Sequence, residues 1–198
     1  MINKVKKIKN IFPKNNFETN VYIEHKKIVN NKLSAGKTIS PLRYPGGKTH
    51  ISKKILPYLP NLEEFEEYRE LFLGGGSMAI RVSKNYPHLK IIVNDLYEPL
   101  VNFWRNLQKN GIKMEKELYN LKSICGIQDK SQDDLNARDT RWDKTAELFY
   151  KCKDIIVKNK GNSFERAIAY FVVNRVSFSG LTISSSVSKS NTDSHFNL

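Results

Sequence analysis

Cysteine and histidine are scarce in this sequence. Its 198 residues include two cysteines, Cys125 and Cys152, and four histidines that are scattered along the chain. No Cys-x-x-Cys pair and no Cys/His cluster has the spacing of a zinc site, so we expect no metal centre. Two widely separated cysteines also argue against a disulfide-rich secreted scaffold. We therefore expect both cysteines to be reduced core residues of a cytosolic protein.

Long hydrophobic runs are missing as well. No apolar stretch approaches the length that a membrane-spanning helix needs, so we predict no membrane association. Residues 1–11 are basic but contain no long apolar segment of the kind found in secretory signals, so we expect a cytoplasmic protein that is not secreted. The length allows one domain, with a partial second domain at most.

Acidic residues are outnumbered by basic ones. The sequence has 33 Lys and Arg against 20 Asp and Glu, which gives a formal net charge of +13. This balance favours a polyanionic partner, most often a nucleic acid. A compositional bias toward Lys, Asn and Ile is the alternative explanation, and charge alone does not decide between the two. The lysine-rich residues 1–39 are expected to form a basic, partly disordered arm, and the serine-rich residues 182–198 a flexible tail.

The most informative stretch runs from residue 68 to residue 99. An aromatic and branched run, residues 68–73, predicts a strand, and Gly74, Gly75 and Gly76 follow it directly. A helix is predicted over residues 77–85, before Pro87, and a buried parallel strand over residues 89–93. Asp95 comes 21 residues after Gly74, a spacing typical of βαβ units that bind a nucleoside. A structural tight turn is the alternative explanation of the glycines.

A second glycine-containing stretch, residues 40–49, reads SPLRYPGGKT. It is not a phosphate-binding loop, because Leu42 stands where that motif needs a glycine. The pattern predicts an extended segment, a glycine turn and a helix over residues 49–58. Tyr44 offers an aromatic ring and a hydroxyl, and Lys48 offers a cation for a carboxylate. A turn with a solvated lysine is the alternative.

These stretches, taken in order, resemble the DNA adenine-N6 methyltransferases of the Dam type. The matching blocks are SPLRYPGGKT, RELFLGGGSM and VNDLYEPLVNFW. The resemblance implies a partial Rossmann-like, S-adenosylmethionine-dependent α/β fold over residues 40–111. It also implies that S-adenosylmethionine is the methyl donor, with no metal. The implied cofactor-binding residues are Tyr44, Lys48, Phe72, Gly74, Gly75, Gly76 and Asp95.

A fourth block, YFVVNRVSFSG at residues 170–180, resembles the segment that leads into the family's target-recognition region. We expect residues 112–181 to be helical, with helices over residues 99–109, 115–124 and 142–158 and a further helix capped by Ser163. The resemblance implies that Asn174 and Arg175 contact double-stranded DNA. Helix capping and an internal ion pair are the alternative roles for these two residues.

Two adjacent prolines occur nowhere in the sequence, although the family's catalytic motif is (Asp/Asn)-Pro-Pro-Tyr. No catalytic residue is therefore assigned. We expect a truncated or split adenine-N6 DNA methyltransferase that is inactive alone and depends on a second chain for its catalytic half. A non-catalytic module that binds S-adenosylmethionine or DNA is the first alternative, and an RNA methyltransferase is the second.

Overall fold

The computed structural model describes residues 6–7, 22–23, 40–49, 51–55, 58–126, 135–178, 180–184 and 186–187. Most of the predicted basic arm and most of the predicted tail lie outside these residues. The chain divides into two compact units. The first unit consists of Met1–Thr38, Lys48–Arg69 and Ser77–Ile92, and the second of Ile39–Gly47, Glu70–Gly76 and Val93–Leu198.

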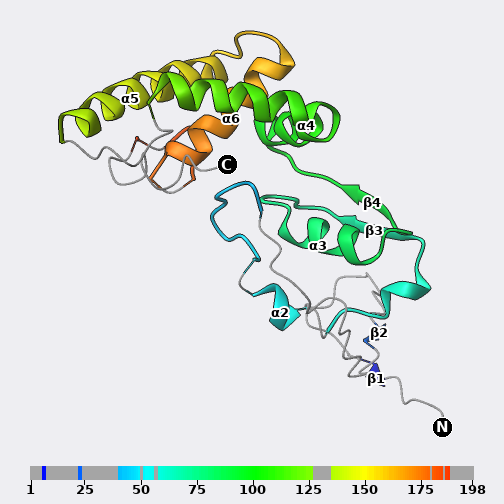
Figure 1. Cartoon of the computed structure of the whole chain (residues 1–198). Coiled ribbons are helices and arrows are strands. Elements are labelled where there is room, and N and C mark those ends of the chain that lie inside the picture. Colours follow the sequence, from blue (N-terminus) through cyan, green and yellow to red (C-terminus); the bar gives the residue numbers. More distant parts are fainter. Residues whose placement is uncertain are drawn as a thin grey trace, which may run out of the picture. The chain divides into compact units, whose positions relative to one another are not determined.

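A strand–helix–strand sequence forms the centre of the first unit. Strand β3 (Glu67–Glu70) and strand β4 (Lys90–Val93) lie side by side and run parallel, and helix α3 (Ser77–Asn85) connects them (Figure 1). The Lys90 N–H donates to the Glu66 carbonyl at 2.8 Å, and the Asn94 N–H donates to the Glu70 carbonyl at 2.9 Å. The predicted bounds of α3 are confirmed, and each predicted strand is present in a shorter form.

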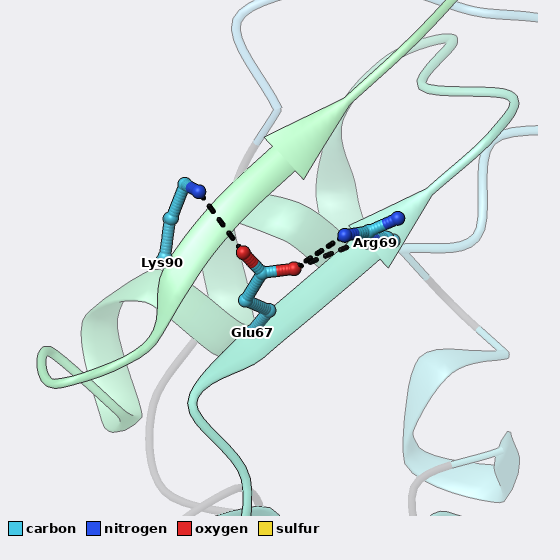
Figure 2. A network of polar contacts seen from close by, with 3 residues as sticks. All are labelled: Glu67, Arg69 and Lys90. Carbon is cyan, nitrogen blue, oxygen red and sulfur yellow. Dashed lines mark hydrogen bonds and ion pairs between the residues drawn. The ribbon is translucent and has the colours of Figure 1, made fainter.

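The two faces of this sheet differ because successive strand residues point in opposite directions. Tyr68 and Ile91 pack against a small core that α3 contributes to, built from Leu62, Met78, Val82, Tyr86 and Leu89. On β3, Glu67 and Arg69 are two residues apart, and the Glu67 carboxylate binds both Arg69 and Lys90 (Figure 2). Strand β4 is therefore only half-buried, whereas its apolar sequence had suggested a fully buried strand.

The remaining elements of the first unit are short. Strands β1 (Lys6–Lys7) and β2 (Tyr22–Ile23) pair antiparallel. Helix α2 (Ser52–Ile55) is a single turn, and a 3-10 turn, η2, covers Leu62–Glu64. The helix predicted over residues 49–58 was thus too long at its beginning, because residues 49 and 51 are turn residues.

Three helices form the second unit: α4 (Glu98–Ile124), α5 (Leu135–Val157) and α6 (Ser163–Val176) (Figure 1). Both α4 and α5 pack against α6. Helix α6 is apolar on nearly all sides, as expected of a helix enclosed by others. Its buried residues include Tyr170, Phe171 and Val172, and Phe103 of α4 stacks on Phe171 with ring centroids 5.7 Å apart.

Three local features of these helices differ from the prediction. Helix α5 begins at Leu135, whereas the predicted helix began at residue 142. The helices predicted over 99–109 and 115–124 are joined into α4 across a kink at Asn110, whose backbone is not helical (φ −130°, ψ 22°). The cap of α6 is Asn162 rather than Ser163, because Asn162 and Glu165 exchange the hydrogen bonds of a capping box. The Ser163 hydroxyl instead donates to the buried Asn102 at 2.6 Å and ties α6 to α4.

The architecture is a mixed one of helices and a small parallel sheet, which agrees with the predicted α/β class at that level. Among the described residues, no helix combines the length and the apolar character needed to cross a membrane.

Candidate functional site

The glycine turn after β3 and the acid after β4 meet in the second unit. The Gly74 N–H donates to Asp95 Oδ2 at 2.9 Å, and the Leu73 N–H donates to the Asn94 carbonyl at 2.8 Å. The other carboxylate oxygen, Asp95 Oδ1, accepts from the Tyr97 N–H at 3.1 Å. The residues that end the two parallel strands are therefore adjacent, and Asp95 fixes the spacing between them.

Two aromatic rings fill the space around the glycine turn. A Cβ on Gly74 (φ +48°) would lie 2.9 Å from the Tyr44 ring, and a Cβ on Gly76 (φ +68°) would lie 2.7 Å from the Trp104 ring. Both positions also have the left-handed backbone that glycine tolerates best. The Trp104 indole N–H donates to the Gly74 carbonyl at 3.1 Å. Glycine is thus required here by close packing against the chain's own side chains.

The segment of residues 40–44 lies against this turn. The Ser40 hydroxyl donates to the Gly75 carbonyl and accepts from the Leu42 N–H at 3.1 Å. Leu42 is buried in the core of the second unit, and Tyr44 packs at its edge. The motif that contains Tyr44 and the glycine motif therefore form one structure, although about 30 residues separate them.

Three tyrosines surround Asp95. Burial raises the pKa of Tyr44, and the nearby charge of Asp95 raises it further. The pKa of Tyr170 is raised in the same way, first by burial and then by Tyr97, Tyr44 and Asp95. Burial also raises the pKa of Tyr97, against a smaller opposite effect of its hydrogen bond to Thr182. All three hydroxyls stay protonated at neutral pH and can donate hydrogen bonds.

Two exposed apolar residues neighbour this turn and this acid in the sequence. Phe72 precedes the glycine turn and is 85% exposed, and Leu96 follows Asp95 and is 97% exposed. Leu96 was not singled out from the sequence, because a leucine in this position resembles any loop residue.

The amide of Asn174 joins three parts of the second unit. Asn174 is fully buried, its Oδ1 accepts from the Arg43 N–H at 2.9 Å, and its Nδ2 donates to the carbonyls of Arg43 and Gly180, each at 2.8 Å. Gly180 has φ +74°, and a Cβ there would overlap the Arg43 carbonyl. The contact of Asn174 with DNA stays a prediction.

Two arginines lie near the C-terminal end of α6. The Arg43 guanidinium donates to the carbonyls of Ser177 at 2.8 Å and Phe178 at 2.9 Å. Burial lowers the pKa of Arg175, and the neighbouring positive charge of Arg43 lowers it further. Sequence reasoning missed Arg43, because its partners lie more than 130 positions later in the chain.

The structure thus brings most of the predicted cofactor residues together. Gly74, Gly75, Gly76, Tyr44 and Asp95 form one cluster, with Phe72 at its edge. Lys48 is exposed and belongs to the first unit, so its role stays a prediction. Within the described residues, no three His, Cys, Asp or Glu side chains are grouped to hold a metal ion. The contacting residues not foreseen are Ser40, Arg43, Tyr97 and Trp104.

Comparisons with known proteins identify the family of this chain. A family model, the D12 class N6 adenine-specific DNA methyltransferases, matches residues 44–196. The type II methyltransferase M.MjaIII of Methanocaldococcus jannaschii is 29% identical over 145 residues, which cover 71% of this chain and 46% of that protein. The DNA N-6-adenine-methyltransferase of Escherichia phage P1 is 27% identical over 143 residues, or 72% of this chain and 16% of that protein.

A third relative, the type II methyltransferase M.FokI of Planomicrobium okeanokoites, is 31% identical over 96 residues, which cover 48% of this chain and 14% of that protein. The chain therefore spans less than half the length of each of these relatives. The family match begins at Tyr44 and includes the glycine turn, Asp95 and the Asn174 region. This chain belongs to the D12 class of N6 adenine-specific DNA methyltransferases.

Proposed function

We propose that this chain supplies the S-adenosylmethionine-binding part of an adenine-N6 DNA methyltransferase, with β3, α3 and β4 as the beginning of a Rossmann-like fold. The observation that carries the proposal is the hydrogen bond from the Gly74 N–H to Asp95 Oδ2 at 2.9 Å. It places the glycine turn beside an acid that follows the neighbouring strand, and nucleoside-binding α/β units use a turn and an acid in these positions. The family match supports the same assignment.

The residues around Asp95 fit an adenosyl ligand. A carboxylate has about four lone-pair sites. Within the described residues, two backbone N–H groups, those of Gly74 and Tyr97, bind the Asp95 carboxylate. The remaining sites can accept hydrogen bonds from the two hydroxyls of a ribose. Phe72 and Leu96 are exposed apolar residues close in sequence to the turn and the acid, and they could pack on the flat base or the methionine chain.

S-adenosylmethionine supplies a methyl group on a sulfonium centre, which a nitrogen of adenine can accept. The sequence contains no Pro-Pro pair, so the family's motif for binding the adenine amino group is not among these 198 residues. We therefore propose that methyl transfer needs catalytic residues from outside this sequence, for example from a second chain. The residues described above bind and orient the donor, and they perform no chemical step themselves.

Double-stranded DNA is the proposed acceptor. The formal net charge of +13 provides general attraction for a phosphate backbone, and the Arg43–Arg175 pair provides a local concentration of positive charge. We propose Arg175 as a DNA-contacting residue and Asn174 as the side chain that holds the segment beside it. Binding of this kind should weaken steeply as salt is added.

Calorimetric titration of the full chain with S-adenosylmethionine tests the donor site. Asp95→Asn should lower the affinity by about tenfold or more, since hydrogen bonds to a charged group are worth about 1.5–3 kcal/mol. Asp154→Asn is the matched control, because Asp154 is an exposed acid on α5 that pairs with Lys158 and Lys160. Leu96→Ser adds a variant at a site so exposed that the fold should not change. Equal affinity in all four proteins would refute the proposal.

Methyl transfer is tested separately from binding. The chain is incubated with labelled S-adenosylmethionine and an adenine-containing duplex, alone and together with a chain that carries Asp-Pro-Pro-Tyr. We expect transfer only in the mixture. Transfer by this chain alone would show that its own residues complete the active site. Donor binding without transfer in any mixture would favour a non-catalytic binding module, and preference for RNA over DNA at equal salt would favour an RNA methyltransferase.

A further inference from the structure

Tyr97 connects the acid of the donor site to a distant part of the same unit. Its backbone N–H donates to Asp95 Oδ1 at 3.1 Å, and its phenol is hydrogen-bonded to the Thr182 hydroxyl at 2.8 Å. We propose that Tyr97 is a positioning residue that couples occupancy of the Asp95 site to the order of residues 177–187. The inference rests on the proposed function, because it takes a nucleoside at Asp95 as its starting point.

The location of Tyr97 in the chain favours such a role. It is the N-cap residue directly before α4, a position where the side chain of Ser, Thr, Asp or Asn normally binds the first helical N–H groups. Tyr97, which the structure describes in full, makes no side-chain capping bond of this kind. Its half-buried ring packs edge-on against Tyr170, with centroids 6.1 Å apart, so its direction is fixed. The hydroxyl is thereby aimed at Thr182.

The other partner, Thr182, belongs to a segment that is held firmly at its base. Ser177 and Val187 form an isolated bridge, and the Phe178 N–H donates to the Ser186 carbonyl at 3.2 Å. Arg43 and Asn174 hold the same base through the carbonyls described above. Farther along, Thr182 is only 8% exposed, whereas its neighbours Leu181 and Ile183 are 45% and 51% exposed. The Tyr97 hydroxyl is thus a polar contact that holds the segment at Thr182.

The coupling follows from this geometry. A ligand bound to Asp95 restrains the turn formed by Asp95, Leu96 and Tyr97, and the restrained phenol keeps Thr182 in place. By linkage, anything that orders residues 177–187 must strengthen ligand binding at Asp95 by the same factor. The segment exposes Phe178 and Leu181 close to Arg43, so an ordered segment presents a defined surface for a nucleic acid. Tyr97 would then link donor binding to acceptor binding.

Hydrogen exchange of backbone amides, followed by mass spectrometry of the full chain, tests the proposal with S-adenosylhomocysteine as a non-reactive probe. In the unmodified protein, the probe should slow exchange in residues 72–97 and, by about fivefold or more, in residues 178–187. Tyr97→Phe keeps the ring and the backbone N–H and removes only the hydroxyl. In this variant the probe should still slow exchange in residues 72–97 but no longer in residues 178–187. Exchange in residues 178–187 should also be faster than in the unmodified protein when no probe is present.

Further variants separate coupling from general destabilisation. Thr182→Val should change the exchange in residues 178–187 as Tyr97→Phe does, because it also removes one hydroxyl of the pair. Thr182→Ser keeps that hydroxyl and should behave like the unmodified protein. The double variant Tyr97→Phe/Thr182→Val should exchange no faster than either single variant. Tyr150→Phe, at an exposed tyrosine of α5, is the control and should change nothing. Slowing in 72–97 without slowing in 178–187 of the unmodified protein would overturn the inference and leave the proposed function standing. No slowing in either region would overturn both.

Discussion

Trp104 and Gly74 are joined by a hydrogen bond of 3.1 Å between the indole N–H and the glycine carbonyl. The same indole ring lies against the α-carbon of Gly76, so close that a Cβ there would be 2.7 Å away. A residue in the second turn of α4 therefore holds the loop that follows β3. This contact gives the glycine turn a rigid support within the second unit, independent of any ligand.

We predict that Trp104→Phe loosens the glycine turn. The change removes the N–H donor and part of the supporting ring, which should lower the free energy of unfolding by about 1–2 kcal/mol. Affinity for S-adenosylmethionine should fall as well, because Gly74 and Asp95 would lose their fixed spacing. Urea unfolding and calorimetry measure the two effects. Trp142→Phe, at the other tryptophan of the chain, should leave the donor affinity unchanged.

We predict that Gly180→Ala destabilises the second unit far more than Gly46→Ala does. Both glycines have φ +74°, so an alanine is equally strained by the backbone at either position. A Cβ on Gly180 would overlap the Arg43 carbonyl, whereas a Cβ on Gly46 would meet nothing within 4 Å. Urea unfolding should show a loss of about 1 kcal/mol for Gly46→Ala, as is usual for a left-handed alanine, and a clearly larger loss for Gly180→Ala. Equal losses would show that the Arg43–Gly180 contact is unimportant.

We predict a loss of stability at high pH that depends on Cys152. Burial raises the pKa of the Cys152 thiol from 9.0 to about 12. The unfolded chain therefore loses this proton at lower pH than the folded protein. The contribution of the Cys152 thiol to the free energy of unfolding is therefore complete below about pH 9 and is lost as the pH rises toward 12. Chemical unfolding at a series of pH values should show a shallower alkaline decline for Cys152→Ala. Parallel curves for the two proteins would contradict the prediction.

We predict a small, salt-sensitive contribution from the ion pairs on the exposed face of the sheet (Figure 2). Hydrogen bonds from Arg69 and then Lys90 lower the pKa of Glu67. Because the carboxyl pKa is lower in the folded protein, Glu67 stabilises the fold at pH values above its unfolded pKa of 4.5. This stabilisation is lost as the pH falls through the pKa of the folded state. Glu67→Gln should lower the midpoint of thermal unfolding slightly at neutral pH and low salt.

The difference between Glu67→Gln and the unmodified protein should disappear at high salt or in acid, because exposed charges are screened by ions. Glu117→Gln, at an exposed position of α4, is the control and should show no such salt dependence. A midpoint difference for Glu67→Gln that persists in molar salt would indicate a role beyond the ion pairs.

Local patterns predicted the parts of the structure that depend on neighbouring residues. The bounds of α3 were correct because Pro87 ends the helix and the glycine turn precedes it. The pairing of Gly74 with Asp95 was implied by their spacing, because parallel strands joined by one helix end at the same edge. The family resemblance added Tyr44, which no periodicity would have connected to the glycine turn.

Contacts between distant segments could not be predicted in this way. Trp104 lies within an apolar helical stripe, and nothing local distinguishes a core tryptophan from one that binds a glycine carbonyl 30 positions earlier. Asn174 was considered for DNA binding because the family resemblance implied that role. Its partners, Arg43 and Gly180, become visible only when the segments are folded together.

The bond between Arg43 and Asn174 also has a consequence for synthesis on the ribosome. The two residues are 131 positions apart. At about 5–20 residues per second, roughly 7 to 26 seconds pass between their appearances in the growing chain. Throughout that interval the Arg43 backbone cannot bind the Asn174 side-chain amide, because Asn174 has not yet been made. This part of the nascent chain therefore stays without its folded-state partner until then. The second unit can therefore acquire its final form only late in translation, once α6 has emerged.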